Sequence, residues 1–221
     1  MLTVISLGGS LVYPKKLDKV FIAKFRQLIS DYVKKGHRFA IYCGGGYLAR
    51  KWQKRFSFIR IRYLLDWIGI FATRRNAKIL KKNMKIKVYK RIIINPTKKI
   101  NFEEGVLLAA GWKPGWSTDY DAVLLARNLG AKRVVNMTNV DYVYDKDPRK
   151  HKDAKPIKRI FWEDFKKLVG SEWKPGLNMP FDPIATKEAG KLKLNVVIIG
   201  KDLKNLENLL KNKNFEGTMI S

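Results

Sequence analysis

The stretch Gly111-Trp112-Lys113-Pro114-Gly115-Trp116-Ser117-Thr118-Asp119-Tyr120-Asp121 decides how this chain folds. It follows an apolar run, Val106–Ala110, that is typical of a buried strand in a parallel sheet, because no polar residue alternates with the apolar ones. The residues after it, Asp121–Leu129, place apolar side chains at the spacing of a packed helix. Strand, turn and helix in this order predict an α/β fold.

The turn between this strand and this helix has two interpretations. Its glycines, proline, hydroxyls and carboxylate precede a helix N-terminus, where exposed backbone N–H groups bind anions. Alternatively, the turn is a rigid connection in which Ser117, Thr118 or Asp119 caps the helix. Similar turns elsewhere in the chain favour the anion site.

Two further glycine turns follow apolar runs. Gly8-Gly9-Ser10 comes after the apolar N-terminal residues, and Gly44-Gly45-Gly46 comes directly after Phe39–Cys43. A turn without side chains lets backbone amides approach a phosphate closely. Arg50 lies early on the helix expected after the second turn, where its guanidinium can bind a phosphate in a bidentate manner.

The rest of the chain continues the alternation of strands and helices. Asp18 and Asp182 are expected to cap helices, and Gly36, Gly130 and Gly170 are expected to end them. Further strands are expected at Val88–Tyr89, Ile92–Ile94, Arg133–Met137, Leu194–Ile199 and Gly217–Ile220, and a loop at Trp173–Pro180. The alternation predicts a doubly wound sheet with ligands at the C-terminal ends of its strands.

Composition narrows the classes of protein and partner. A chain of 221 residues with 46% hydrophobic residues fits one sizeable α/β domain. Cys43 is the one cysteine, which excludes an intrachain disulfide. No apolar stretch is long enough to span a bilayer, and the apolar N-terminus lacks a basic leader, so we expect a cytoplasmic protein with no membrane partner.

The net charge of +27 favours anionic partners, namely nucleotides, nucleic acid or a membrane surface. Lysines are spread along the whole chain, so a solvated basic surface is the simpler explanation. The segment Arg50–Tyr63 alternates cations with aromatic rings, which is the best local case for a nucleic-acid-binding module. We prefer an amphipathic helix and loop whose rings face the core or a subunit partner.

Three further positions each have a functional and a structural interpretation. Asp66 suits the two hydroxyls of a ribose, and it equally suits the N-cap of the helix that continues through Ala72 and Leu80. The polar segment Thr138–Pro148 suits a nucleoside and its phosphates, or a polar hairpin. Lys187, one turn into the helix after Asp182, either points at a bound phosphate or is solvated.

In their order and spacing, these motifs resemble the amino-acid-kinase superfamily and, within it, the archaeal-type UMP kinases. The resemblance covers nearly the whole chain. It rests on Gly8-Gly9-Ser10, Gly44-Gly45-Gly46 with Leu48-Ala49-Arg50, Asp66 with Ile68-Gly69, Pro114-Gly115 with Ser117-Thr118-Asp119, Thr138-Asn139-Val140-Asp141 with Val143-Tyr144 and Asp147-Pro148, Asp182-Pro183 with Ala185 and Lys187, and Gly217-Thr218.

The resemblance implies an open αβα sandwich with a mostly parallel central sheet, as in carbamate kinases. The whole chain, 1–221, would be a single domain, with an acceptor-binding half over about 1–130 and an ATP-binding half over 131–221. The implied reaction transfers the γ-phosphoryl group of ATP to UMP, giving UDP and ADP in pyrimidine nucleotide synthesis. The implied cofactor is Mg²⁺, carried by ATP rather than by a protein metal site, and the implied assembly is a homohexamer.

Residue by residue, the resemblance implies two substrate sites and a pair of catalytic cations. ATP would be bound by Gly9, Ser10, Gly46, Arg50, Thr138, Asn139, Tyr144 and Asp147. UMP would be bound by Gly45, Asp66, Trp112, Lys113, Pro114, Gly115, Trp116, Ser117 and Thr118. The catalytic cations would be Arg50 and Lys187.

The chain departs from the superfamily pattern at the end of its first strand. Many members carry a lysine just before the first glycines, where this chain has Ser6 and Leu7. The alternatives are another small-acceptor kinase of the superfamily, acting on isopentenyl phosphate or N-acetylglutamate, and a non-enzymatic nucleic-acid-binding protein on the same fold. The basic charge motivates the last of these, although we do not expect nucleic acid to be the main partner.

Overall fold

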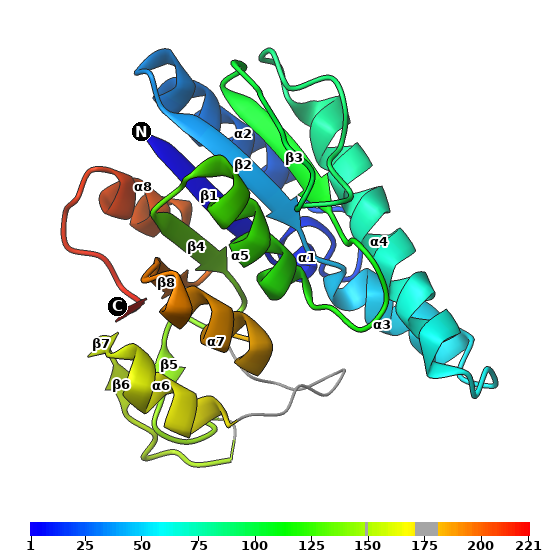
Figure 1. Cartoon of the computed structure of the whole chain (residues 1–221), viewed down its shortest axis with the longest axis vertical. Coiled ribbons are helices and arrows are strands. Elements are labelled where there is room, and N and C mark those ends of the chain that lie inside the picture. The colour runs from blue at the N-terminus through cyan, green and yellow to red at the C-terminus, as the bar shows by residue number, and fades with distance from the viewer. Residues whose placement is uncertain (149, 171–180) are drawn as a thin grey trace.

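The computed structural model describes residues 1–148, 150–170 and 181–221. Within this part of the chain, a seven-stranded sheet has the order β3-β2-β1-β4-β8-β9-β7 (Figure 1). A separate antiparallel pair joins β5 and β6. The strands are β1 Leu2–Leu7, β2 Arg38–Cys43, β3 Val106–Ala110, β4 Arg133–Met137, β5 Val143–Tyr144, β6 Pro156–Ile157, β7 Arg159–Ile160, β8 Asn195–Ile199 and β9 Thr218–Ile220.

The centre of the sheet is parallel. Every pair from β3 through β2, β1 and β4 to β8 runs in parallel, and β9 runs antiparallel to β8. The central strands are apolar along nearly their whole length because both faces of the sheet are covered. The expected mostly parallel sheet is confirmed.

Helices cover the two faces and make a three-layer αβα sandwich (Figure 1). On one face, Ile5 of β1 packs in a cluster with Phe25 of α2. The side chain of Val4, the residue before Ile5, lies on the other face of the sheet and packs there with Val123 of α5. The helices are α1 Gly9–Val12, α2 Lys19–Lys34, α3 Gly46–Arg55, α4 Arg62–Asn83, α5 Thr118–Leu129, α6 Trp162–Val169, α7 Pro183–Lys191 and α8 Leu203–Leu210.

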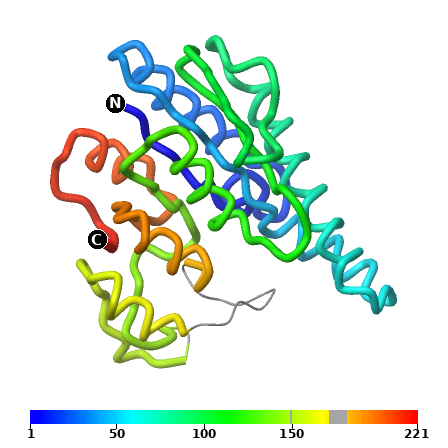
Figure 2. Tube along the Cα trace, in the orientation of Figure 1, coloured from blue at the N-terminus to red at the C-terminus, as the bar shows by residue number. Residues whose placement is uncertain are grey.

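Helices α3 and α4 pack against each other at one side of the sheet. Figure 2 shows that the ends joined by residues 56–61 project well beyond the rest of the chain. Among the described residues, no helix combines the length and the apolar character that crossing a bilayer requires.

Local capping follows the sequence closely. Asp18 accepts a hydrogen bond from Phe21 N at 2.9 Å, and Asp182 accepts from the first turn of α7. Of the three candidates for the α5 cap, Ser117 holds the position and accepts from Tyr120 N at 3.1 Å. Gly130 ends α5 with a φ of +67°, the left-handed conformation that glycine adopts most easily.

Two expectations about local structure are wrong. Val88 and Ile93 each make a single bridge to the β3 edge instead of forming strands, because the segment touches β3 at only two points. Asp66 does not cap a helix, since α4 already begins at Arg62 and Asp66 lies within it. The rings of Phe56, Phe58 and Tyr63 are exposed, so of the two partners expected for them, the core and another subunit, the core is excluded. The loop expected at Trp173–Pro180 lies outside the described residues.

Candidate active site

Strand order places the polar loops of the chain at one edge of the sheet. The chain runs from β1 to β2 and β3 on one side of β1, and then crosses to β4 on the other side. Such a reversal opens a crevice at the C-terminal ends of the two strands involved. The turns after β1, β2, β3 and β4 therefore meet at this edge.

The two glycine turns after β1 and β2 lie in direct backbone contact. A Cβ on Gly9 would lie 2.3 Å from the carbonyl oxygen of Gly44. A Cβ on Gly46, whose φ is +57°, would lie 2.1 Å from Ser10 N. Any side chain at either position would push the turns apart, so the close approach requires glycine.

Ser10 connects the first turn to the N-terminus of α3. Its Oγ accepts hydrogen bonds from Tyr47 N at 2.8 Å and from Arg50 Nη2 at 3.1 Å. The first turn of α3 contains no acidic residue, so its backbone N–H groups and the Arg50 guanidinium together make this point electropositive. Gly9, Ser10, Gly46 and Arg50 are thus close together, and their role toward ATP stays a prediction.

The loop after β3, residues 111–117, is held from several sides. Gly111 N donates to Thr73 Oγ1 at 2.8 Å, and Gly115 N donates to Asp66 Oδ2 at 3.0 Å. Trp112 N donates to Asp121 Oδ2 at 3.1 Å. We call residues 111–117 the acceptor loop, because most of the positions predicted to hold UMP lie in it. Asp66 is therefore a loop contact as well as a candidate ribose contact.

Helix α4 contributes residues that the sequence interpretation missed. Arg74 Nη2 donates to the carbonyl oxygens of Gly111, at 3.4 Å, and Trp112, at 3.2 Å. Asn76 is fully buried and donates to Gly44 O at 2.8 Å, so the same helix also supports the second glycine turn. The one signal that pointed to Asn76 is its position on the face of α4 that otherwise carries Ile70, Ala77 and Leu80.

The large side chains of the acceptor loop contact one another and the first turn of α5. Trp116 stacks on Tyr120 with ring centroids 4.5 Å apart, and the Lys113 ammonium lies 4.2 Å from the centre of the Trp112 ring. Pro114 and Thr118 are partly exposed beside them.

Two carboxylates lie in the first turn of α5, directly after the acceptor loop, and neither was predicted as a site residue. Asp119 accepts a hydrogen bond from Ser6 Oγ at 2.9 Å. Burial and, to a smaller extent, the negative charge of Asp182 together raise the pKa of Asp119 to about 7, against the lowering effect of the hydrogen bond from Ser6. The serine that replaces the expected first-strand lysine is therefore a neutral partner of a carboxylate that readily holds a proton.

Asp121 is completely buried. Burial raises its pKa to about 7, against the lowering effect of its hydrogen bonds with Trp112 N and Tyr42. The Tyr42 hydroxyl lies 2.7 Å from Ala110 O and 2.9 Å from Asp121 Oδ2. Because that hydroxyl has one hydrogen, a proton on Asp121 lets both contacts be hydrogen bonds.

The segment after β4, residues 138–147, which we call the nucleotide loop, is held differently. Its start is attached to the sheet by Thr138 N, which donates to Ile199 O at 2.9 Å. Its middle is attached by Val143 N, which donates to the buried Thr218 Oγ1 at 2.8 Å. The predicted ATP contacts Thr138, Asn139, Tyr144 and Asp147 all lie on this loop.

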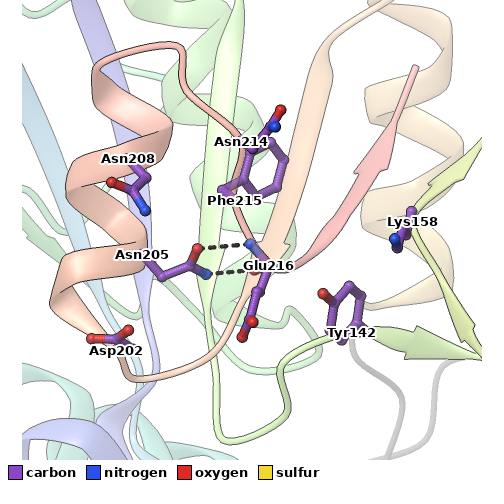
Figure 3. Close-up of a pocket in the computed structure, with 8 residues that line it drawn as sticks. All are labelled: Tyr142, Lys158, Asp202, Asn205, Asn208, Asn214, Phe215 and Glu216. Atoms are coloured by element: carbon purple, nitrogen blue, oxygen red, sulfur yellow. Dashed lines mark hydrogen bonds between the residues drawn. The ribbon is translucent and has the colours of Figure 1, made fainter.

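A cavity of about 660 Å³ lies outside the nucleotide loop, between α8 and β9 (Figure 3). Asn205 lines it and makes two hydrogen bonds to the backbone of Glu216: its Nδ2 donates to Glu216 O, and its Oδ1 accepts from Glu216 N. Tyr142 lines it, but no predicted site residue does.

Lys187 is exposed on α7. The cap of this helix, Asp182, is close enough to Asp119 to affect the pKa of Asp119.

Comparisons with known proteins agree with this geometry. Residues 1–200 match the amino acid kinase family. A uridylate kinase from Pyrococcus abyssi is 34% identical over 226 residues, covering 100% of this chain and 99% of that protein. The uridylate kinase from Thermococcus sibiricus is 33% identical over 225 residues with the same coverage. The crystal structure of uridylate kinase from Archaeoglobus fulgidus superposes with a TM-score of 0.86 at 29% identity, covering both chains completely.

Proposed function

Because this chain belongs to the amino acid kinase family, we propose that it is a UMP kinase, which transfers the γ-phosphoryl group of ATP to UMP and releases UDP and ADP. The observation that carries this proposal is the similarity to uridylate kinases along the entire chain, at about a third of all positions. The site supports it, because helix α4 holds both the acceptor loop, through Asp66, and the second glycine turn, through Asn76.

The ATP phosphates would lie over the contact between the glycine turns. Gly9, Gly46 and the start of α3 offer backbone N–H groups there, and Ser10 and Arg50 offer side-chain donors. The nucleotide loop follows β4, the strand next to β1, so Thr138, Asn139, Tyr144 and Asp147 would contact the nucleoside and its phosphates. The substrate is the magnesium complex of ATP, since Mg²⁺ in such sites is held largely by phosphates and water.

UMP would lie on the other side of the same contact, against Gly45 and the acceptor loop. Asp66 Oδ2 holds Gly115 N, and a carboxylate has further lone pairs that can accept from the ribose hydroxyls. Residues Trp112 to Thr118 would enclose the base and orient the acceptor phosphate.

In the proposed reaction, an oxygen of the UMP phosphate attacks the γ-phosphorus while the bond from this phosphorus to the β-phosphate oxygen breaks. The attacking oxygen is already anionic, so no strong general base is needed. The site contributes in-line positioning and neutralisation of charge on the moving group. We assign that neutralisation to the glycine-turn amides, Arg50, Lys187 and the metal. Ser6 supplies no charge at the first-strand position, so Arg50 carries a larger share.

We further propose a cytoplasmic homohexamer built from a single domain, with the acceptor half in residues 1–130 and the ATP half in 131–221.

The test is ADP release by the purified protein with ATP and Mg²⁺ against UMP, CMP, dUMP, AMP, isopentenyl phosphate and N-acetylglutamate. We expect turnover with UMP to exceed turnover with every other acceptor. Faster turnover with isopentenyl phosphate or N-acetylglutamate would keep the ATP site and reject the assignment of the acceptor loop. No turnover with any acceptor would reject the kinase itself.

Arg50→Ala should lower kcat with UMP by about 10²- to 10³-fold, as removal of one preorganised donor to the transition state does. Arg50→Lys, which keeps the charge but loses the planar fork, is the matched control and should recover part of the rate. An unchanged kcat in Arg50→Ala would remove this residue from the mechanism.

A further inference from the structure

The positive charge of this protein is concentrated in one third of the chain. Residues 32–102 contain 20 of the 46 Lys and Arg residues but only one of the 19 acidic residues, Asp66. This third therefore carries +19 of the net charge of +27. Lysines occur everywhere in the sequence, but the acids that would balance them do not occur here.

Most of this basic third lies along one side of the molecule. Figure 1 shows α3, α4 and the segment that follows α4 together at this side. The kinase site uses Arg50 and Asp66 from α3 and α4. Further along α4, Thr73 and Arg74 hold the acceptor loop and Asn76 holds the second glycine turn, whereas the projecting end of the helix pair has no role in the proposed reaction.

The projecting end exposes aromatic rings. We define the α3–α4 tip as residues 51–64. Phe58 is 75% exposed and Tyr63 is 58% exposed. Phe56 is also exposed and lies with its ring centroid 6.0 Å from that of Phe58. Rings held this far into water cost hydrophobic free energy unless a partner covers them.

Exposed cations lie between and beside these rings, and the tip contains no acidic residue to neutralise them. The exposed cations of the tip are Lys51, Lys54, Arg55, Arg60 and Arg62. Open ring faces interleaved with unneutralised cations are what single-stranded nucleic acid requires, because bases stack on the rings while phosphates pair with the cations.

We propose that the α3–α4 tip binds single-stranded nucleic acid, as a function separate from phosphoryl transfer. A duplex fits less well, since its base faces are already stacked. A second copy of the tip also fits less well, because two such surfaces would bring like charges together.

Fluorescence anisotropy with a labelled 20-nucleotide RNA of mixed sequence tests the proposal directly. About five phosphate contacts predict that affinity falls about 100-fold between 50 and 200 mM salt. The duplex of the same sequence should bind more weakly. Millimolar ATP and UMP should not displace the strand, because the kinase site lies elsewhere.

Substitutions at Phe58 distinguish stacking from simple apolar contact. Phe58→Ala and Phe58→Leu should each weaken binding about tenfold, because both lose the ring. Arg60→Glu with Arg62→Glu should weaken it further. Lys19→Glu with Lys24→Glu, exposed positions on α2 that make the same change in net charge, is the matched control and should bind much as the unaltered protein does. None of these variants should alter turnover with UMP.

Equal loss of affinity in the α2 control and in the tip variant would overturn the proposal in favour of nonspecific charge. Binding to vesicles of phosphatidylglycerol that Phe58→Leu retains, without binding to RNA, would overturn it in favour of a membrane surface. A change of oligomeric state in the tip variants, with RNA affinity unchanged, would overturn it in favour of self-association.

Discussion

The acceptor loop and the nucleotide loop both follow central strands of the same sheet, yet they are fixed in different ways. The acceptor loop is hydrogen-bonded to buried or half-buried side chains on two helices: Gly111 N and Trp112 N donate to Thr73 and Asp121, and the Trp112 carbonyl accepts from Arg74. Beyond its two attachments to the sheet, the nucleotide loop is held by the short pairing of β5 with β6 and by exposed ion pairs such as Lys146 with Asp153, at 2.5 Å.

Burial decides how strongly each kind of contact acts. A hydrogen bond shielded from water leaves an unpaired group behind when it is broken, whereas an exposed ion pair is replaced by water and salt at little cost. We therefore expect the acceptor loop to be preorganised before UMP binds, and the nucleotide loop to take its final form with ATP. Four substitutions test this difference.

Asp66→Ala should have the largest effect. It removes the acceptor for Gly115 N and the proposed ribose contact together, so we expect kcat/KM for UMP to fall about 100-fold. The KM for ATP should change by less than about twofold, since the substitution lies on the acceptor side. Asp66→Asn keeps an oxygen for Gly115 N and should lose only about tenfold. An equal rise in both KM values would show that the two loops are not separately fixed.

Asp121→Asn should remove a pH dependence of stability. The folded protein raises the Asp121 pKa from 3.8 to about 7, so between these values it holds a proton that the unfolded chain releases. This contribution is full at low pH and is lost as pH rises to 7. Asparagine has nearly the same shape as the carboxyl but does not titrate at any pH in this range.

The free energy of unfolding of Asp121→Asn, relative to the unaltered protein, should therefore rise by about 2 kcal/mol between pH 5 and pH 8. Urea titrations at several pH values measure it. A constant difference between the two proteins across this range would show that Asp121 is ionised throughout.

Thr218→Val should have a smaller effect, confined to the nucleotide side. Valine has nearly the same shape but leaves Val143 N and Ile157 O without the Thr218 hydroxyl. We expect a loss of about 1–2 kcal/mol in stability and a rise of a few fold in the KM for ATP. Thr218→Ser keeps the hydroxyl and should preserve both values. A rise in the KM for UMP alone would contradict the assignment of the nucleotide loop.

Lys146→Ala should have the smallest effect. It breaks the exposed pair with Asp153, and such pairs contribute about 0–1 kcal/mol. The KM for ATP should change by less than about twofold, and Asp153→Ala should behave in the same way. A tenfold change in the KM for ATP would mean that this pair positions the nucleotide.

Much of the fold could be predicted from the sequence because its signals are local. Val106–Ala110 is apolar throughout, and Asp18, Ser117 and Asp182 cap the helices that begin directly after them. The glycine turns could be predicted for the same reason. Glycine lacks a side chain, so a run such as Gly44-Gly45-Gly46 is by itself evidence of a turn.

The site was only partly predictable because its contacts cross long stretches of chain. Arg74 reaches the carbonyl of Trp112, and Ser6 reaches Asp119, over separations of 38 and 113 residues. Neither pair has a spacing that local periodicity can reveal. The helix-cap role considered for Asp66 is wrong, because only the folded chain shows which backbone N–H its carboxylate meets; its role toward a ribose stays a prediction.

The sequence by itself determined the α/β class, the three glycine-containing turns, most helix ends and the excess of positive charge, since each depends on neighbouring residues or on composition. The tertiary structure alone decided three other features: the direct contact of the two glycine turns, the proton-holding environment of Asp121, and the exposure of the tip rings in the basic third of the chain. The physical reason is that contact, burial and exposure belong to pairs of distant segments, and folding determines which segments meet.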